Sequence, residues 1–220
     1  MSDSHADGKA VRNAARRRSL LDAATRLFAR HGYHATTVPM IVAEAGVSIG
    51  AFYLSFRHKE DVLEAALEEL DVELARILAE VHGPDADIPY KMARSVETLF
   101  LFLACHPERA RMLIVESSGL GPRIEGTRRQ LLSHHETFVQ HTLESSPGVS
   151  ELKDASVAAR CVVGSVFEVL YSWLDESPTT RVPAADVARA VAAFNYQALR
   201  KGVHEAPDIP VRLPVTQIEI

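Results

Sequence analysis

The chain has 220 residues, 47% of them hydrophobic, and only 11 Gly and 11 Pro, so it can bury a sizeable core in one small and one larger domain. No apolar run approaches the ~20 residues of a membrane span, and the polar, basic N-terminus lacks the apolar stretch of a signal peptide, so we expect a cytoplasmic protein. The two cysteines, Cys105 and Cys161, argue against a disulfide framework, and each is expected to be an ordinary buried thiol.

Charge is divided unevenly along the chain. Residues 1–60 hold nine Lys and Arg against five Asp and Glu, a net charge of +4, so the remaining 160 residues carry −9 of the total −5. A basic N-terminal unit gives salt-dependent attraction to a phosphate backbone, while the acidic body stays away from it. Residues 1–15 lack apolar periodicity and are predicted to be a disordered basic arm. The run Arg16-Arg17-Arg18 either reaches phosphates or a minor groove or remains solvated, and Arg18 is the DNA-contacting residue that we predict here.

Two short helices joined by a tight turn are predicted next. Thr37 can cap a helix whose first turn holds Pro39, a position where the missing N–H costs nothing. Gly46 can take the left-handed conformation that ends this helix, and Ser48 can cap the following one. This order of residue types is typical of a helix-turn-helix that binds double-stranded DNA.

The second of these helices has an apolar and an outward face. Phe52 and Phe56 stand four residues apart and are expected in the core. A helix that enters the major groove presents its N-terminal residues to base edges, so small side chains allow close approach. The residues expected to face away from the core are Gly50, Ala51, Leu54 and Ser55.

Residues from about 19 to 68 resemble the TetR (tetracycline repressor) family of bacterial transcription regulators. The motifs that carry this resemblance, in the family's order and spacing, are Phe28-Ala29-Arg30-His31-Gly32-Tyr33, Ala35-Thr36-Thr37-Val38, Ala45-Gly46-Val47-Ser48 and Tyr53-Leu54-Ser55-Phe56-Arg57-His58-Lys59-Glu60. The resemblance implies phosphate contacts by Thr37, Ser48, Tyr53 and Lys59, and approach to bases by Ile49, Gly50 and Ala51. Tyr53 as a core aromatic and Lys59 as a solvated side chain are the alternatives.

Ile49 departs from the family's pattern, because many members place a polar or charged residue there. An apolar side chain can pack on a thymine methyl group, which is a contact that reads sequence. We therefore expect a preference for A·T at the base pair that Ile49 meets.

Further helical patterns follow to the end of the chain. One apolar stripe marks a connecting helix from Lys59 to Val81, and other helices are expected at about 90–104, 108–116, 122–144, 152–175 and 184–201. No alternating strand pattern competes, so the predicted fold class is all-α. It comprises a three-helix DNA-binding domain over residues 16–62 and a larger effector-binding and dimerisation domain over residues 63–220. The Pro-rich stretch 207–214 is expected to be extended.

Two apolar helices near the C-terminus predict how the chain dimerises. By resemblance, they meet a symmetry mate in a four-helix interface, although burial within one subunit is an alternative for each residue. The residues expected there are Val157, Cys161, Gly164, Phe167, Val187, Val191 and Phe194. A two-fold dimer presents two recognition helices to half-sites ~34–36 Å or more apart and so binds a palindromic operator.

The resemblance also implies a small-molecule pocket in the second domain. Mostly apolar walls with few polar groups favour a hydrophobic ligand. Most of the residues expected to line the pocket fit plain core better than a pocket wall, and His134, His141 and Glu168 are, beside Glu116, possible polar anchors. The expected lining residues are Phe100, Leu103, Met112, Glu116, Phe138, Phe167, Tyr171 and Trp173.

Metal and catalytic chemistry find little support. His134, His135 and His141 lack the spacing and companions of a metal site, so neither a metal nor another cofactor is expected. The sequence has no Gly-x-Ser-x-Gly elbow, phosphate-binding glycine loop or His-Glu-x-x-His motif, so we expect no enzyme. The predicted function is a homodimeric repressor that an apolar small molecule releases from DNA. The alternatives are a DNA-binding regulator controlled by abundance or a protein partner and, remotely, an enzyme on a helical scaffold.

Overall fold

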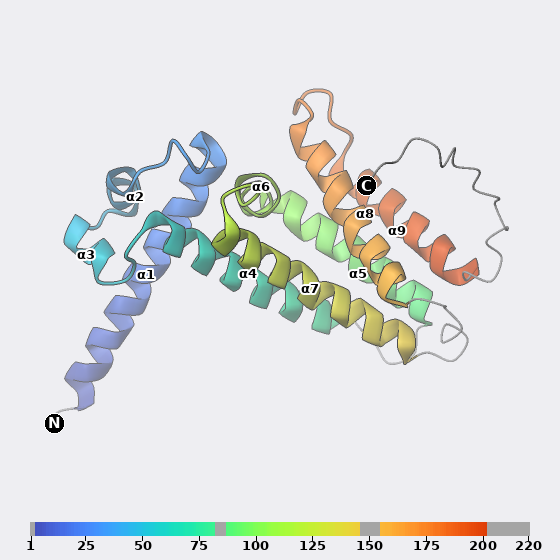
Figure 1. Ribbon diagram of the computed structural model, residues 1–220, viewed down its shortest axis with the longest axis horizontal. Coiled ribbons are helices and arrows are strands. Elements are labelled where there is room, and N and C mark those ends of the chain that lie inside the picture. Colours follow the sequence, from blue (N-terminus) through green and yellow to red (C-terminus); the bar gives the residue numbers. More distant parts are fainter. Residues whose placement is uncertain (1–2, 82–86, 146–154, 202–220) are drawn as a thin grey trace, which may run out of the picture.

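The computed structural model describes residues 3–81, 87–145 and 155–201, and over these ranges the chain is helical without strands (Figure 1). The predicted all-α class is therefore confirmed. The Pro-rich stretch 207–214 lies outside the described residues. The helices are α1 Asp3–His31, α2 Val38–Ala45, α3 Ile49–Tyr53, α4 Lys59–Val81, α5 Ile88–Cys105, α6 Pro107–Arg111, the π-helical turn η1 Met112–Glu116, α7 Pro122–Glu144, α8 Ala155–Asp175 and α9 Ala184–Lys201.

Helix α1 begins earlier than the sequence analysis predicts. It is helical from Asp3, so the expectation of a disordered arm over residues 1–15 is wrong where the structure describes the chain. Residues 9–18 are mostly Ala, Arg and Lys, which have high helix propensity. They extend α1 toward its N-terminus from the part that is buried in the core, around Leu20 and Phe28. The N-terminal half of α1 projects from the body on the side that also carries α3 (Figure 1).

One apolar core runs through the whole molecule. Fully buried Phe28, Ile41 and Phe52 join α1, α2 and α3, and α4 continues the core with Leu63 at one end and Leu74 further along. The predicted domain boundary at residue 62 therefore falls within α4, which packs against α1 as well as α5 and α7.

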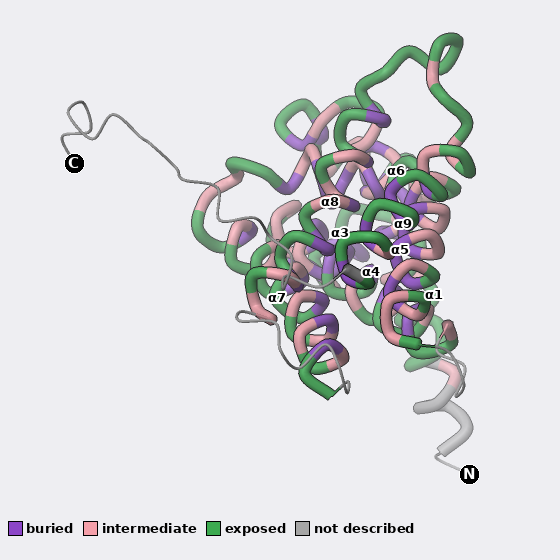
Figure 2. The backbone as a smooth tube through the Cα atoms, turned by 90° about the vertical axis from the view of Figure 1, so that its right-hand side faces the viewer, coloured by how far each residue is buried: buried purple, intermediate pink, exposed green. Residues whose placement is uncertain are grey.

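In the body, α5 packs against α9, and α7 packs against α4 and α8. The buried residues line the facing sides of these helices, and the exposed residues lie outside (Figure 2). The N-terminal unit meets the body through α4 and through α6 and η1, all of which pack against α1.

Helix α8 is long and apolar enough to cross a membrane by length and composition, the one such helix among the described residues. Here it packs against α7, α5 and α9. Its buried face includes Val162, Val166 and Leu170, while Val157 and Tyr171 are exposed. One side of α8 is thus open to solvent in the single chain.

Both cysteines correct the sequence analysis. Cys105, at the last turn of α5, and Cys161, on the outer face of α8, are exposed free thiols rather than buried ones. Burial was predicted because both cysteines have apolar neighbours in the sequence. The helical period nevertheless turns these two positions away from the core.

Candidate nucleic-acid interface

The turn between α2 and α3 has the geometry that its residue types predict. Thr37 Oγ1 accepts the N–H of Met40 at 3.4 Å, and Gly46 ends α2 in the left-handed conformation with φ 66°. Ser48 Oγ then accepts the N–H of Ala51 at 3.2 Å and caps α3. The two caps and the glycine fix the angle between the helices, so they decide which face of α3 is presented to solvent.

That outer face is formed by Ile49, Gly50 and Tyr53. The side chain of Ile49 is 51% exposed and that of Tyr53 58%, and Gly50 is also exposed. Leu54, just after the helix, is exposed as well, whereas Phe52 and Phe56 are buried as predicted. Ile49, Gly50 and Tyr53 are therefore exposed positions on a short, capped helix, and they form a ridge that can fit into a groove of DNA.

Ala51 does not belong to that ridge. Its side chain is 8% exposed and is buried against the body of the DNA-binding unit. The expectation that Ala51 approaches bases is therefore wrong, because one step along the helix from Gly50 turns the side chain inward by about 100°.

Lys59 corrects a second predicted DNA contact. Its Nζ donates to the carbonyl oxygens of Tyr33 (2.7 Å), His34 (3.2 Å) and Thr36 (2.9 Å), and it lies 4.2 Å from the centroid of the Tyr33 ring. An ammonium group has three N–H donors, so none is left for a phosphate. Burial lowers the pKa of Lys59, partly opposed by the nearby Glu60. The side chain anchors the loop before α2 to the start of α4.

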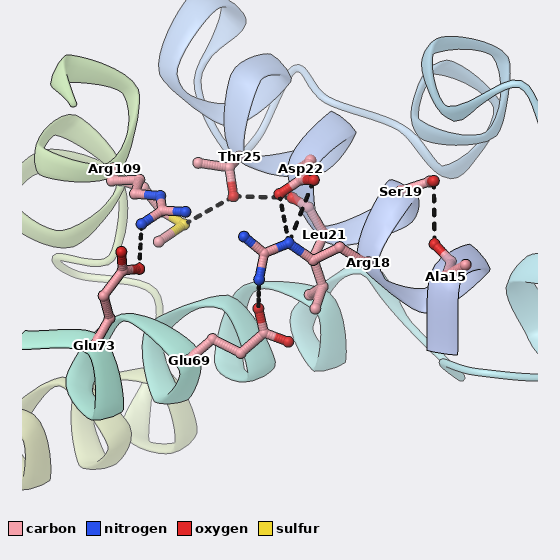
Figure 3. Close-up of polar contacts among 10 residues, drawn as sticks. Ala15, Arg18, Ser19, Leu21, Asp22, Thr25, Glu69, Glu73 and Arg109 are labelled. Carbon is pink, nitrogen blue, oxygen red and sulfur yellow. Dashed lines mark hydrogen bonds and ion pairs between the residues drawn. The ribbon is translucent and has the colours of Figure 1, made fainter. Parts of the chain in front are cut away.

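Arg18 faces the body rather than the outer face of α3. Its guanidinium contacts Asp22 at 3.2 Å and Glu69 on α4 at 3.3 Å, in a cluster that also holds the Arg109–Glu73 pair (Figure 3). The predicted DNA contact by Arg18 does not fit this placement. Sequence reasoning could not assign the face, because it treated the segment before Arg16 as disordered.

Arg17, one residue earlier, is the arginine that lies beside α3. Its guanidinium stacks 4.5 Å from the centroid of the Phe56 ring. It lines an open depression together with Tyr53 and Arg57 at the end of α3. Two cationic side chains thus flank the exposed ridge.

The loop between α3 and α4 is fixed by Asp61. Its Oδ2 accepts the N–H groups of Arg57 (2.7 Å) and His58 (3.0 Å), and its Oδ1 pairs with Arg123 of α7 at 2.8 Å. Burial by itself raises the pKa of the Asp61 carboxyl, but the hydrogen bonds from Arg123, His58 and Arg57 outweigh it and lower the pKa. The sequence analysis missed this role, although a carboxylate three residues into a helix start is a known capping signal.

The predicted pocket residues are mostly core. A cavity of about 30 Å³ lies between α4, α5, α7 and α8, and of the predicted lining residues only Phe138 borders it. Tyr171 is exposed on α8, Phe167 is half-buried, and Glu116 contacts the N-terminal unit instead. The buried residues that do not border this cavity are Phe100, Leu103, Met112 and Trp173, of which Met112 borders instead an open depression of about 450 Å³ between α1, α4 and α6.

Trp173 shows why aromatic spacing misled the sequence analysis. Its ring packs edge-on against Phe100 with centroids 6.1 Å apart, and its indole N–H donates to the carbonyl of Val182 at 2.8 Å. The guanidinium of Arg181 covers the ring at 4.3 Å. These contacts on the ring face, the ring edge and the indole N–H show that Trp173 packs within its own chain.

The residues predicted at a dimer interface divide into exposed, half-buried and buried ones. Val157, Cys161 and Gly164 are exposed on one face of α8, and Phe194 on α9 is 68% exposed. Phe167 and Val187 are half-buried. Val191 is 6% exposed and lies in the core of its own chain, so it is wrong as an interface residue.

A model of bacterial regulatory proteins of the tetR family matches residues 20–66, the segment that forms the C-terminal part of α1, all of α2 and α3, and the start of α4. Residues 20–66 thus form a TetR-type DNA-binding region. A relative of the chain, the fatty acid metabolism regulator protein of Bacillus subtilis, is 25% identical over 158 residues, which cover 70% of this chain and 81% of that protein. An HTH-type transcriptional repressor of Mycobacterium tuberculosis is 43% identical over 70 residues, or 32% of this chain and 37% of that protein.

Solved structures agree on the fold over most of the chain. The fatty acid degradation regulator FadR from Bacillus halodurans has a TM-score of 0.72 at 24% identity, covering 81% of this chain and 96% of its own. FadR from Bacillus subtilis, solved in complex with stearoyl-CoA, has a TM-score of 0.72 at 22% identity with the same coverage. The match to the tetR-family model and the curated relatives support a DNA-binding transcriptional regulator, and those relatives are regulators rather than enzymes.

Proposed function

We propose that the protein is a ligand-responsive repressor that binds a palindromic operator as a homodimer and leaves it when a small apolar molecule binds the body. The observation that supports the proposal most strongly is the exposed ridge of α3. There Ile49, Gly50 and Tyr53 face solvent, while Phe52 and Phe56 hold the segment in the core. A soluble regulator of this kind acts in the cytoplasm, where the DNA is.

The roles of the ridge follow from its chemistry. Thr37 and Ser48 sit at helix N-termini, where backbone N–H groups and the helix dipole favour phosphate. The Tyr53 hydroxyl donates to a phosphate, and Arg17 replaces Arg18 as the neighbouring cation. Gly50 lets the backbone approach base edges, and Ile49 packs on a thymine methyl.

Dimerisation is supported by the exposed apolar face of α8 and α9. Val157, Cys161, Gly164 and Phe194 give this face small and apolar side chains in two adjacent helices. Burying it against a second copy forms a two-fold interface and sets the spacing of two α3 helices.

Responsiveness to a ligand is supported by the relatives. The Bacillus subtilis FadR structure holds stearoyl-CoA, and a relative from Paenarthrobacter nicotinovorans, 33% identical over 73 residues, is a nicotine-responsive repressor. A ligand that prefers one spacing of the recognition helices shifts DNA binding by its differential affinity, typically about 1–3 kcal/mol.

Selection of bound duplexes from a random pool tests the proposal. We expect an enriched palindrome with an A·T preference that Ile49→Ala weakens. Phe194→Asp is expected to give a monomer by analytical ultracentrifugation that no longer binds the palindrome, whereas Val72→Asp, at a residue 72% exposed on α4, keeps the dimer. Selected sites without two-fold symmetry, or an unchanged preference in Ile49→Ala, would contradict it.

A regulator without an effector is the second candidate. The cavity between α4, α5, α7 and α8 holds only about 30 Å³, whereas pockets for drug-sized ligands occupy about 300–1,000 Å³. The larger depression of about 450 Å³ between α1, α4 and α6 is open and has many charged lining residues, which does not suit an apolar effector. A screen in which no small molecule raises the melting temperature or changes DNA affinity supports this second candidate over the first.

A further inference from the structure

The segment that forms α3 and its two flanking turns lacks the side chains that usually read bases. From residue 45 to residue 56 the chain contains no Asp, Glu, Lys, Arg, Asn or Gln. In the major groove these are the residue types whose hydrogen bonds tell one base pair from another. The face of α3 that is open to solvent must therefore distinguish DNA sequences in some other way.

The charged side chains next to this segment are held by other parts of the chain or lie at its far end. Glu44 of α2 pairs with Arg26 of α1 at 3.0 Å, and Lys59 donates to three backbone carbonyls. Arg17 and Arg57 line the depression at the end of α3, the opposite end from its first residue. A helix in the major groove contacts bases with its N-terminal residues, so cations at the other end fit phosphates instead.

The hydroxyl groups of the segment do not supply the missing selectivity. Ser48 Oγ accepts the N–H of Ala51 at 3.2 Å, and Tyr53 stands at the last position of α3. A hydroxyl both donates and accepts, so it can meet either kind of base edge and selects neither. The first turn of α3 is left with the apolar side chain of Ile49, which is 51% exposed, beside the exposed Gly50.

We propose that α3 reads the C5-methyl group of a pyrimidine rather than the base pair that carries it, so that 5-methylcytosine is bound as well as thymine. Both bases place this methyl group at the same position in the major groove. They differ beside it, because thymine presents an acceptor at position 4 and cytosine an amino donor. Ile49 has no donor or acceptor that responds to this difference. The inference rests on the proposed function, since it names what the exposed ridge of α3 recognises.

Gly50 gives the first turn the close approach that a methyl contact needs. A Cβ at Gly50 would meet only Ser48 Oγ, at 4.0 Å, so the space beside Ile49 is open. Phe52 and Phe56 are buried and hold α3 from the core side. The Ile49 side chain is therefore presented from a fixed backbone, with no neighbouring side chain at position 50 to keep the groove wall away.

Two changes to DNA isolate the methyl group from the hydrogen-bonding groups. Replacing thymine by uracil removes the methyl and leaves the base-pairing edge unchanged. Methylating cytosine at C5 adds the methyl and likewise leaves that edge unchanged. Transfer of a methyl group to C5 of cytosine is thus the class of reaction that can strengthen a binding site for this protein without changing its sequence.

Fluorescence anisotropy with the full-length protein and its selected duplex tests the proposal. Each thymine is first replaced by deoxyuridine, with symmetry-related positions changed together, to find where the methyl matters. That position is then made as thymine, uracil, cytosine or 5-methylcytosine, each with its complementary base. We expect the two methylated duplexes to bind alike, and each to bind about fourfold more tightly per half-site than its unmethylated counterpart, the effect of burying one methyl group.

Three results overturn the proposal. The first is that no deoxyuridine substitution lowers affinity. The second is an affinity that follows the base pair, with thymine and uracil alike and both cytosine duplexes weaker. The third is a thymine duplex that binds more tightly than the 5-methylcytosine duplex by a factor larger than the methyl effect.

Two variants assign the contact to Ile49. Ile49→Ala should bring the four duplexes to within about twofold of one another, because most of the apolar surface that meets the methyl is gone. Leu54→Ala removes similar surface at a residue that is 80% exposed just after α3, and it should keep the methyl ratios. Both side chains are exposed, so both variants should melt like the wild type. Ratios that Leu54→Ala abolishes, or that Ile49→Ala retains, overturn the assignment.

Failure here differs from failure of the proposed function. The methyl ratios can be measured on any duplex that the protein selects, so selection of sites without two-fold symmetry contradicts the proposed function and leaves this test intact. If the affinities follow the base pair while Gly50→Glu abolishes binding, α3 remains the DNA-binding helix and only the reading of the methyl group is wrong.

Discussion

A carboxylate of the body holds the peptide that leads into the DNA-binding unit: Glu116 Oε2 accepts the backbone N–H of Tyr33 at 2.8 Å. The carbonyl oxygen of Tyr33 accepts a hydrogen bond from Lys59 Nζ at 2.7 Å. Tyr33 is therefore held by η1 on one side and by α4 on the other. Its ring is buried, which raises the pKa of Tyr33 to about 12, with Glu60 and Asp61 adding to the effect and Arg123 opposing it.

Glu116→Ala is expected to lower the free energy of unfolding by about 1–3 kcal/mol, because the buried N–H of Tyr33 loses its partner. Urea unfolding measures this cost, and amide hydrogen exchange should become faster at Tyr33. Glu125→Ala is the control, since Glu125 accepts the N–H of Gly119 in an exposed loop where water can replace it. Similar costs for the two variants would contradict a structural role for Glu116.

Lys59→Met is expected to weaken DNA binding without changing its salt dependence. The substitution removes three hydrogen bonds that order residues 33–36, and we expect unfolding to become easier by about 1–3 kcal/mol. Fluorescence anisotropy at several salt concentrations gives the slope of log affinity against log salt. A slope that falls by about one unit would restore Lys59 as a phosphate contact.

Arg17→Ala and Arg18→Ala form a matched pair of neighbouring charge deletions. Arg17 flanks α3 through its stacking on Phe56, so its loss should reduce the salt slope by about 0.9. Arg18 is paired with Asp22 and Glu69, so its loss should leave the slope unchanged. Fluorescence anisotropy titrations at several salt concentrations measure both slopes. A smaller slope in Arg18→Ala and an unchanged slope in Arg17→Ala would contradict the assignment, since Arg18 would then be the arginine that contacts phosphate.

Stability is expected to fall between pH 7.5 and 5.5 through His135. Burial lowers the pKa of this histidine, His134 adds to the effect, and Asp71 opposes it. The unfolded chain, with a histidine pKa near 6.5, then binds more protons below that pH, so this contribution is present above about pH 6.5 and is lost as the pH falls below it. The slope reaches at most about 1.4 kcal/mol per pH unit.

Urea unfolding of the wild type and of His135→Phe at both pH values measures this effect. The variant should lose less stability than the wild type, since it lacks the buried group that takes up the proton. An equal loss in the two proteins would assign the pH dependence to other groups.

Local chemistry made the fold predictable from the sequence. Thr37, Gly46 and Ser48 act through backbone groups within five residues of themselves, and the structure places each as predicted. The apolar stripe of α4 likewise predicted a helix that the structure ends at Val81.

Long-range partners account for the errors. Lys59 contacts carbonyls 23–26 residues away, Arg18 pairs with a carboxylate 51 residues away, and Glu116 contacts a backbone amide 83 residues away. A sequence motif assigns such residues by type alone and cannot show that another part of the chain already occupies them. Val191 failed for a related reason, since an apolar residue at a helical spacing fits either a core or an interface.

The central claim is that the outer face of α3 meets DNA, and Gly50 offers the most direct test. A Cβ at Gly50 would meet only Ser48 Oγ at 4.0 Å, so Gly50→Glu fits the free protein. Gly126→Glu, where a Cβ meets nothing within 4 Å on α7, adds the same charge away from α3. Anisotropy titration of the selected operator should show binding lost in Gly50→Glu and kept in Gly126→Glu, with both melting like the wild type. Operator binding by Gly50→Glu at wild-type affinity would contradict the account.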